Sequence, residues 1–592
     1  MDGRAFPGLI RRTVKDGGQA MGDKVVILGA GVAGLTAADE LSRCGFEVDV
    51  YERRGIVGGK ARSFFLEDGR PAEHGFRFFP GFYRHLHHTM RHIPYQGQRR
   101  GVRGNLVTTK DVQVLQATRK PVDMPTRLWT WDTVFLRSIR LGARHKFTAS
   151  FGLSRQDIGQ LVRRLRTLLA ACPERRFAVY EDEGWLEFSG AEEIGGHYKK
   201  MVSALTRSLV AAHADELSVR TGGYILLQLQ LAMLRLKGHL PAVLNGPTST
   251  VWLEPWREYL ESRGVRFHFK HAVQEIHCAD GRIREVIVRD TTGTAFPVQG
   301  RWYVAALPFE IMKGLVTPDM EKADPSLGRI RLLKDRWMNG IMFYLGEDEP
   351  LVRGHTIYVD SAWALTSISQ QQFWHRPDLG SVNGRKVAGI LSVDVSDWES
   401  PGKFCKKPAS SCTKQEIIDE VLAQLREHLK HTGKDVLADG NIVGCFVDQD
   451  IRLPNPGGAA VNLEPLLINT TGSWENRPQA CTEIENLFLA SDYVRTYTDL
   501  ATMEGANEAA RRAVNGILER SGLLERPGSA KLRCRTWPLR YPGGLFLWFR
   551  GRDRKRLMRE KPGDFEKASE LIEQLTLGGG SGSGRRGGGG GG

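Results

Sequence analysis

Residues 24–52 read KVVILGAGVAGLTAADELSRCGFEVDVYE, and this stretch decides the fold. Residues 24–28 form a short apolar, β-branched run that predicts a strand, the pattern through Leu41 predicts a helix, and residues 47–51 predict a second strand. The turn between the first strand and the helix has the G-x-G-x-x-G pattern, Gly29-Ala30-Gly31-Val32-Ala33-Gly34. This order of elements indicates a β-α-β unit that binds a dinucleotide.

Each glycine of this turn has a physical role. Gly29 permits the tight turn, Gly31 lets a pyrophosphate approach the backbone, and Gly34 lets the helix pack closely on the strand. Phosphate oxygens would then meet free N–H groups at the helix N-terminus. Glu52 lies 18 residues beyond Gly34 and can accept hydrogen bonds from ribose hydroxyls.

A glycine pair after the second predicted strand distinguishes FAD from NAD as the bound dinucleotide. In Gly58-Gly59-Lys60-Ala61-Arg62, the glycines permit a close backbone approach and Arg62 can pair with a pyrophosphate. Together with Glu73-His74-Gly75-Phe76-Arg77-Phe78-Phe79, this segment resembles the flavin-containing amine oxidase and phytoene desaturase superfamily, with Glu73 at the position of the usual Asp. The resemblance implies FAD as the cofactor.

The far end of the chain carries a second part of the resemblance. Residues 486–492 (NLFLASD) and 502–506 (TMEGA) are similar to the C-terminal flavin motif of the superfamily, with Ser491 where glycine is common. By resemblance, Asp492 binds a ribityl hydroxyl, and the helix that starts near Met503 directs its N-terminus at the flavin, where its dipole stabilises negative charge on the reduced ring. Residues 272–273 would contact adenine, and the motif order agrees over residues 23–520.

The resemblance implies cofactor-binding residues from several parts of the chain: Gly29, Ala30, Gly31, Val32, Ala33, Gly34, Glu52, Arg53, Gly59, Lys60, Ala61, Arg62, Gly75, Phe76, Arg77, Val273, Asp492, Thr502 and Met503. The catalytic candidates are Arg77, which can stabilise negative charge beside the ring, His74, which, like Glu73, can move a proton, and Tyr497. A structural role competes for Arg77, which can equally pair with a carboxylate. No metal site is predicted, because the eight cysteines are scattered and no His/Cys cluster has zinc spacing.

Two positions separate the branches of the superfamily. Its amine oxidases typically hold a lysine near flavin N5 and an aromatic residue immediately before the M-E-G-A segment. Here the first position falls at Asn339 or Gly340 and the second at Thr502, so both features are missing unless Lys334 or Tyr497 substitutes. Segments 74–83, 363–370 and 492–500 resemble bacterial carotenoid desaturase and hydroxysqualene dehydroxylase-like proteins. That branch implies a long lipophilic isoprenoid substrate.

The basic charge of the chain is localised. The chain has 592 residues and a formal net charge of +15, of which residues 97–146 contribute +8 and residues 531–561 contribute +9. The second segment places LFLWF (545–549) directly before a cluster of arginines, which resembles an interfacial membrane anchor, although the aromatic residues can also pack on the protein. No nucleic-acid-binding motif is present, so no nucleic-acid partner is predicted.

No run of 18 apolar residues and no signal-peptide h-region is present, which predicts a cytoplasmic protein, or one peripheral on the inner face of the membrane. The fold class predicted is α/β, a discontinuous Rossmann-like FAD-binding domain plus a mixed-sheet substrate domain with helical insertions. The predicted parts are listed in order: an N-terminal tail (1–22), FAD-binding parts (23–120, 251–310 and 481–521), a helical insertion (121–250), a substrate domain (311–480), a basic apolar extension (522–577) and a Gly-rich tail (578–592).

The sequence therefore predicts an FAD-dependent oxidoreductase that acts on a lipophilic isoprenoid or carotenoid-like substrate, by desaturation or a related hydride transfer to or from flavin N5. No second G-x-G-x-x-G follows a strand, so the electron partner is expected to be the substrate, oxygen, a quinone or a separate carrier. Two alternatives stay open: a flavin amine or amino-acid oxidase, and a flavin-bound isomerase or structural protein without net redox turnover.

Overall fold

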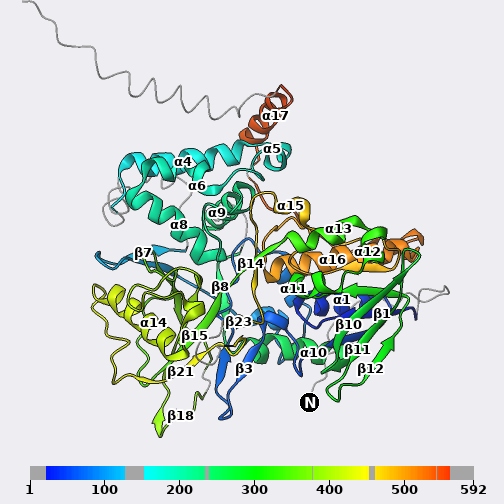
Figure 1. Ribbon diagram of the computed structural model, residues 1–592, viewed down its shortest axis with the longest axis horizontal. Coiled ribbons are helices and arrows are strands. Elements are labelled where there is room, and N and C mark those ends of the chain that lie inside the picture. Colours follow the sequence, from blue (N-terminus) through cyan, green and yellow to red (C-terminus); the bar gives the residue numbers. More distant parts are fainter. Residues whose placement is uncertain are drawn as a thin grey trace, which may run out of the picture.

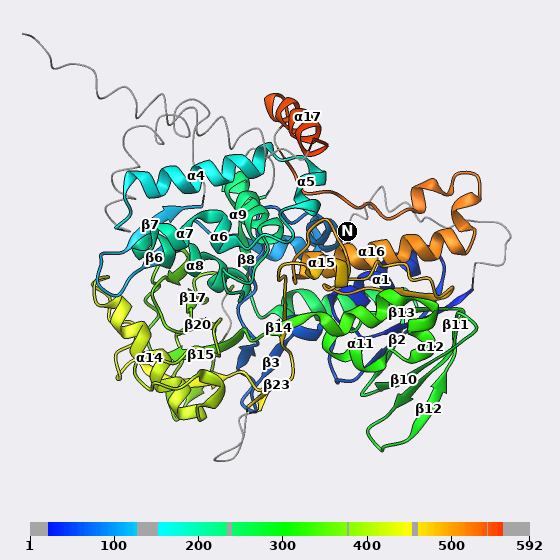
Figure 2. The ribbon, with the colours of Figure 1, turned by 45° about the horizontal axis from the view of Figure 1, so that its top comes forward.

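The structure is a computed structural model that describes residues 22–126, 152–233, 239–375, 378–452, 460–541 and 543–559. Two β-sheet regions lie side by side, and a group of helices lies over one of them (Figures 1 and 2). Figure 1 shows the region that contains the N-terminal strands on the right and the region that contains β15 and β21 on the left. The predicted α/β fold class is confirmed.

A five-stranded parallel sheet is assembled from distant parts of the chain, and we call the region around it the nucleotide half. The order of its strands is β25 (Leu487–Leu489), β13 (Trp302–Ala305), β1 (Lys24–Leu28), β2 (Glu47–Glu52) and β9 (Arg266–Phe269). The strands predicted at 24–28 and 47–51 are confirmed, and the second extends by one residue to Glu52. A three-stranded antiparallel sheet lies next to it, formed by β10 (Ala272–Ala279), β11 (Arg282–Arg289) and β12 (Ala295–Val298).

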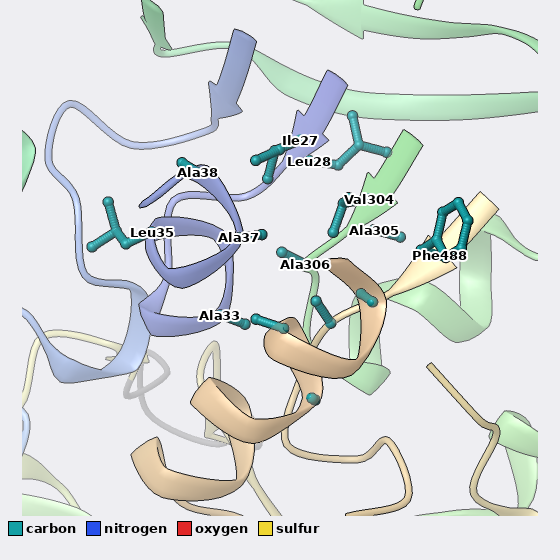
Figure 3. Close-up of a cluster of buried hydrophobic side chains, with 14 of the residues drawn as sticks. Ile27, Leu28, Ala33, Leu35, Ala37, Ala38, Val304, Ala305, Ala306 and Phe488 are labelled. Carbon is teal, nitrogen blue, oxygen red and sulfur yellow. The ribbon is translucent and has the colours of Figure 1, made fainter. Parts of the chain in front are cut away.

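Two helices from opposite ends of the sequence pack together on this sheet. They are α1 (Val32–Arg43) and α16 (Met503–Arg520), and the Asn507 Nδ2 donates to Thr36 Oγ1 at 2.8 Å between them. Figure 3 shows Ile27 and Leu28 of β1 beside Val304 and Phe488 of the neighbouring strands, with the small side chain of Ala33 at the junction of the helices. Small residues at this junction allow the close approach of α1 and α16.

A seven-stranded sheet forms the centre of the other region, which we call the substrate half. Its order is β21 (Ile442–Val447), β15 (Asn339–Leu345), β20 (Gly389–Val395), β17 (Thr366–Ser369), β16 (Gly354–Tyr358), β6 (Asp111–Leu115) and β7 (Val122–Pro125). On its outer face, Ile341, Phe343 and Val393 are buried in one hydrophobic cluster with residues of α14 (Lys414–Leu429). Because side chains alternate along a strand, Gly340, Met342 and Asp394 lie on the opposite face, which we call the inner face.

A helical layer lies above the seven-stranded sheet (Figure 2). It contains α4 (Arg155–Ala170), α5 (Pro173–Ala178), α6 (Trp185–Ser189), α7 (Ala191–Ile194), α8 (Gly196–Val210) and α9 (Val219–Met233). The helix α9 begins at Val219, where the Oγ of Ser218 accepts the backbone N–H of Thr221 and caps the helix.

The last helix, α17 (Leu545–Leu557), lies against this layer. Asp553 is 2% exposed and accepts hydrogen bonds from Arg175 Nε and from the backbone N–H of Cys172, both at 2.8 Å. The end of the basic apolar extension and the Gly-rich tail (578–592) lie outside the described residues.

The other elements connect these regions. The helices are α2 (His85–Met90), α10 (Glu254–Glu261), α11 (Phe309–Leu315), α12 (Pro318–Ala323), α13 (Pro325–Gly328) and α15 (Ser473–Asn476). The short strand pairs are β3 (Ser63–Phe65) with β4 (Pro71–Glu73), β5 (Leu106–Thr108) with β8 (Ala242–Leu244), β14 (Lys334–Arg336) with β24 (Leu466–Ile468), β18 (Ser381–Val382) with β19 (Arg385–Lys386), and β22 (Ile451–Arg452) with β23 (Val461–Asn462).

Candidate functional site

In the first glycine loop, Gly29 and Gly34 are required by the backbone and packing of the protein itself, whereas Gly31 is not. A Cβ on Gly34 would lie 2.0 Å from the Gly29 carbonyl oxygen, and Gly29 has a φ of +99°. A Cβ on Gly31 would meet nothing nearer than Gly59 Cα, at 3.9 Å. Gly31 therefore keeps open a space at the N-terminus of α1 that no side chain of the described chain needs, as expected where a phosphate approaches.

The N-terminus of α1 carries no side-chain cap. The residues predicted to meet a phosphate, Val32 and Ala33, lie in its first turn, where backbone N–H groups have no partner within the helix. Glu52 Oε2 accepts the backbone N–H of Ala30 at 2.8 Å, and its Oε1 accepts that of Arg54 at 2.9 Å. This fixes the Glu52 carboxylate beside the loop, with lone pairs left for hydroxyl donors.

The second glycine pair lies directly against the first loop. The Gly58 backbone N–H donates to the Ala30 carbonyl at 2.8 Å, and Gly59 has a φ of +55°. A Cβ on Gly59 would lie 3.1 Å from Gly31 Cα. The two loops predicted to hold one pyrophosphate are therefore neighbours.

Arg62 lies in a buried network of ion pairs. Its guanidinium, 2% exposed, donates to the Gly59 carbonyl at 2.7 Å and pairs with Asp450 and Glu464. Glu464 also pairs with Arg53 at 2.7 Å, and Arg54 lies 3.0 Å from Asp450. Sequence analysis did not single out Asp450 or Glu464, because no local motif marks them.

His74 joins the same network. Its Nδ1 lies 2.6 Å from Asp448 Oδ2 and 3.6 Å from Asp450 Oδ2. Burial lowers the pKa of His74, but the Asp448 carboxylate outweighs burial and the pKa is raised. Asn339, at one of the positions where amine oxidases hold a lysine, donates to Asp448 Oδ2 at 2.6 Å.

His74, Asp448 and Asp450 also form a group whose ligand atoms lie within 4.8 Å of one another. Such spacing can hold a metal ion. However, Arg54 and Arg62 already neutralise Asp450, and a divalent cation would add charge beside two guanidinium groups. We therefore assign the group to the ion-pair network.

Lys60, in the second glycine loop, interacts electrostatically with Asp492. Its Nζ pairs with Glu310 Oε1 at 2.7 Å and donates to the Pro465 carbonyl. Burial lowers the pKa of Lys60, while the carboxylates of Glu310 and Asp492 outweigh burial and raise it. Asp492 is half-buried and accepts the Ser491 hydroxyl at 3.2 Å.

Arg77 lies between the two halves of the molecule. Its guanidinium donates to the backbone carbonyls of Lys60 at 2.7 Å and Gly75 at 2.8 Å, and its Nε to that of Ala61 at 3.3 Å. Arg77 and Phe76 also line a small cavity. The other lining residues are Glu73, Val243, Leu244, Gly246, Thr248, Ile368, Gln370, Phe373 and Trp374.

The N-terminus of α16 is anchored close to the glycine loops. Thr502 caps the helix, its Oγ1 accepting the Gly505 backbone N–H at 3.1 Å, and Met503 is the first helical residue. Glu504, buried at 2% exposure, accepts the backbone N–H groups of His85 at 2.8 Å and Leu86 at 2.9 Å at the start of α2. The two predicted ends of the nucleotide site are thus brought together.

Two predicted residues lie at the margin of this arrangement. Tyr497 is 47% exposed, and its ring packs against Arg512, whose Cζ lies 4.4 Å from the ring centroid. It lies outside the residues that line the cavity. Val273 is half-buried on β10, opposite Val288.

Asp394 is a residue that sequence reasoning missed. It lies on the inner face of β20 and is 6% exposed. A Cβ on Gly75 would lie 2.6 Å from Asp394 Oδ1. Burial raises the pKa of Asp394 to about 7, despite the opposing charges of Arg77 and His74. No local motif surrounds Asp394, so only the pairing of β20 with β15 reveals its place beside the Gly75 loop.

The residues present fit an FAD molecule. The space above Gly31 suits a diphosphate, the fixed Glu52 carboxylate suits a ribose, and the N-terminus of α16 lies in the same half of the molecule. Pairing between Asn507 and Thr36 places the beginning and the end of the predicted site within one packed unit.

Comparisons with known proteins agree with this geometry. The family model for flavin containing amine oxidoreductases matches residues 32–518. The zeta-carotene desaturase of Synechocystis sp. is 24% identical over 533 residues, covering 85% of this chain and 98% of that protein. The 15-cis-phytoene desaturase of Synechococcus elongatus is 24% identical over 530 residues, covering 86% of this chain and 98% of that protein.

Solved structures show the same fold. An oxidoreductase from Methanosarcina mazei superposes with a TM-score of 0.54 at 15% identity, covering 84% of this chain and all of the other. Cyclohexylamine oxidase from Brevibacterium oxydans has a TM-score of 0.54 at 14% identity, covering 85% of this chain and all of the other.

Proposed function

Because the chain belongs to the flavin containing amine oxidoreductase family, as an FAD-dependent oxidoreductase, we propose that its substrate is a lipophilic isoprenoid of the carotenoid class. One observation carries this proposal: the curated relatives that the chain matches over 98% of their length are zeta-carotene and phytoene desaturases. The reaction we propose is desaturation or a related hydride transfer.

The lysine position supports this branch over amine oxidation. A Cβ on Gly340 would lie 2.9 Å from Gly75 Cα, so a side chain there would collide with the loop. Asn339 is committed to Asp448, and Thr502 is committed to capping α16. These contacts support a site that lacks a lysine at 339–340 and an aromatic residue at 502, the two features expected of an amine oxidase.

FAD supplies hydride acceptance or donation, and the protein supplies position and charge. We propose that the α1 N-terminus, Gly31 and Gly59 hold the diphosphate and that Glu52 holds the ribose. Arg62 and Arg77 fix the loops, since each donates to backbone carbonyls. The N-terminal N–H groups of α16 would stabilise negative charge.

We propose that Asp448, which raises the pKa of His74, favours a positive charge on this ring beside the Gly75 loop. Arg77 carries a second positive charge there, while its guanidinium is held by the carbonyls of Lys60 and Gly75. Both positive charges would stabilise negative charge that develops on the flavin ring when it is reduced. Tyr497 is left out of this scheme because its side chain is largely exposed.

The test uses purified holoenzyme under anaerobic conditions. We expect a C40 polyene hydrocarbon such as phytoene, supplied in vesicles, to bleach the oxidised flavin, or to reoxidise flavin that has first been photoreduced. A panel of primary amines serves as the comparison. Bleaching by amines with no response to any isoprenoid would identify an amine oxidase and overturn the proposal. Reoxidation with oxygen or a quinone then identifies the electron acceptor.

A membrane surface as the source of this substrate is supported by α17. Leu547 and Trp548 are 62% and 53% exposed, and Arg552 lies 4.6 Å from the centroid of the Trp548 ring. Apolar side chains beside a basic cluster favour an anionic lipid interface. Among the described residues, none of the helices has both the length and the apolar character required to cross a bilayer.

Flotation with phosphatidylglycerol vesicles tests this surface. We expect the double variant Leu547→Ser/Trp548→Ser to lose flotation, and high salt to weaken flotation of the unchanged protein. Phe404→Ser is the matched control, because Phe404 is 50% exposed in the substrate half, outside α17. Equal flotation of all three proteins would reject α17 as the membrane-binding surface.

A further inference from the structure

Two thiol groups lie close together in the loop between β20 and α14. The Sγ atoms of Cys405 and Cys412 are 3.9 Å apart. Cys412 belongs to the hydrophobic cluster on the outer face of the seven-stranded sheet, and Cys405 packs against that cluster. A disulfide has an S–S distance of about 2.05 Å, so the two sulfur atoms would have to approach each other by about 1.9 Å. Rotation of one cysteine side chain about χ1 can supply such a movement.

Hydrogen bonds fix the backbone of this loop around the thiols. The Gly402 backbone N–H donates to the Lys407 carbonyl at 2.8 Å, which closes the turn that contains Cys405. Glu420 of α14 is buried and accepts the backbone N–H of Cys405 at 2.6 Å. A Cβ on Gly402 would lie 2.6 Å from Cys405 Sγ, so the glycine leaves room for this thiol. The loop therefore holds Cys405 beside Cys412 without a bond between the two sulfur atoms.

The two thiols differ in their access to solvent. Cys412 is 3% exposed, whereas Cys405 is half-buried. Burial raises the pKa of the Cys412 thiol, and the negative charge of a Cys405 thiolate raises it further. Lys407 is a positive charge that interacts with both thiols and favours their thiolate forms. Cys405 is therefore the thiol that an oxidant in solution meets first, and Cys412 is placed to react with it afterwards.

We propose that Cys405 and Cys412 form a reversible disulfide in response to a disulfide oxidant such as oxidised glutathione. The Cys405 thiol loses its proton and its sulfur attacks one sulfur of the oxidant, which breaks the S–S bond of the oxidant and releases one glutathione. Cys412 then loses its proton and attacks Cys405 Sγ, which releases the second glutathione. Two protein thiols lose two electrons, and one glutathione disulfide is reduced to two glutathione molecules.

The disulfide would restrain a segment that joins the substrate half to the helical layer. Asp397, at the start of the same loop, pairs with Arg207 of α8 and accepts the Ser400 backbone N–H at 2.8 Å. Neither cysteine lines the cavity, so the inference does not depend on the proposed function. Thiols of this kind stay reduced where glutathione is reduced, and the bond would therefore report a change in redox conditions.

Peptide mapping of the full-length holoenzyme tests the proposal. Trypsin separates the two cysteines by cleaving after Lys406, so Cys405 falls in peptide 404–406 and Cys412 in peptide 407–414. The protein is incubated with oxidised glutathione, its remaining thiols are alkylated in denaturant, and the digest is analysed by mass spectrometry. We expect most chains to yield the two peptides joined by a disulfide, and dithiothreitol to separate them. Recovery of both cysteines in alkylated form, or of Cys405 only as its glutathione adduct, would overturn the proposal.

Serine variants test the order of the two steps. Cys412→Ser should trap the glutathione adduct on Cys405, because the second thiol is absent. Cys405→Ser should leave Cys412 unmodified, because the remaining thiol is buried. An adduct of equal yield in the two variants would overturn the assigned order of attack.

The matched control is Cys481→Ser, which removes the thiol of an exposed residue in the nucleotide half. We expect this variant to yield the linked peptides 404–406 and 407–414 in the same amount as the unchanged protein. Loss of the linked peptides in this variant would show that the bond arises by exchange through Cys481, and would overturn direct formation from the neighbouring pair.

Discussion

The nucleotide half and the substrate half place their polar groups differently. In the nucleotide half, the glycines, Glu52 and the helix N-terminus follow one another within residues 29–52. In the substrate half, buried polar side chains such as His355, Ser367 and Asp394 come from β16, β17 and β20, which meet only through strand pairing. A cofactor common to a whole family can be held by a local motif, whereas substrate preference depends on contacts between strands distant in the sequence.

The largest expected effect is the loss of FAD binding when the first glycine loop of the nucleotide half is altered. Gly31→Asp would place a carboxylate beside the diphosphate, and two unit charges 4 Å apart repel by about 4 kcal/mol at an intermediate dielectric, roughly a thousandfold in affinity. We expect colourless protein, measured as FAD released per chain.

Two alanine variants sharpen this prediction. Gly31→Ala should fold and retain FAD better than the aspartate variant, because its Cβ has space. Gly34→Ala should fail at packing, because its Cβ would lie 2.0 Å from the Gly29 carbonyl oxygen. Stoichiometric FAD in Gly31→Asp would remove the diphosphate from this loop.

The next largest effect is a loss of thermal stability when the ion pairs that join the helical layer to the nucleotide half are broken. Asp499, in the loop before α16, pairs with Arg477 and, through its other oxygen, with Arg220 of α9. Removing one partner from a buried ion pair costs about 3–5 kcal/mol. We expect Asp499→Asn to lower the thermal denaturation midpoint by roughly 3 °C.

Asparagine is a suitable replacement because Asp499 has a φ of +47°, which asparagine tolerates. The control is Asp68→Asn, which breaks the exposed pair of Asp68 with Arg70 and should cost less than about 1 kcal/mol. Equal shifts in the two variants would show that the Asp499 network contributes no more than a surface pair.

The smallest expected effect is a pH dependence in the substrate half. The pKa of Asp394 is raised to about 7 in the folded protein, so the unfolded chain loses this proton first and stability falls as pH rises from about 4 to 7. The full penalty is roughly 4 kcal/mol at most. Burial raises the pKa of Asp394, and the negative charge of Glu73 raises it further, while the positive charges of Arg77 and His74 lower it.

Asp394→Asn isolates this contribution from the other titrating groups. We expect the difference in denaturation midpoint between the variant and the unchanged protein to move in favour of the variant between pH 5 and pH 8. A constant difference across that range would contradict the raised pKa.

Sequence reasoning predicted the elements whose signals are local. The strand at 24–28 and the helix through Leu41 follow from short-range periodicity and turn residues, and the resemblance implied the helix start near Met503. The partners of Arg62 could not be predicted this way, because Asp450 and Glu464 lie about 400 residues away. Asp394 was missed for the same reason, since its register with Gly340 determines what it faces.

The strand order of the nucleotide half has a consequence for synthesis of the chain. β1 pairs with β13, which in turn needs β25, and α16 follows still later. At about 5–20 residues per second, roughly 20–90 s separate the emergence of Leu28 from that of Leu489. Throughout this interval one edge of the growing sheet lacks its neighbouring strand, so the nucleotide half cannot be completed before Leu489 has been synthesised.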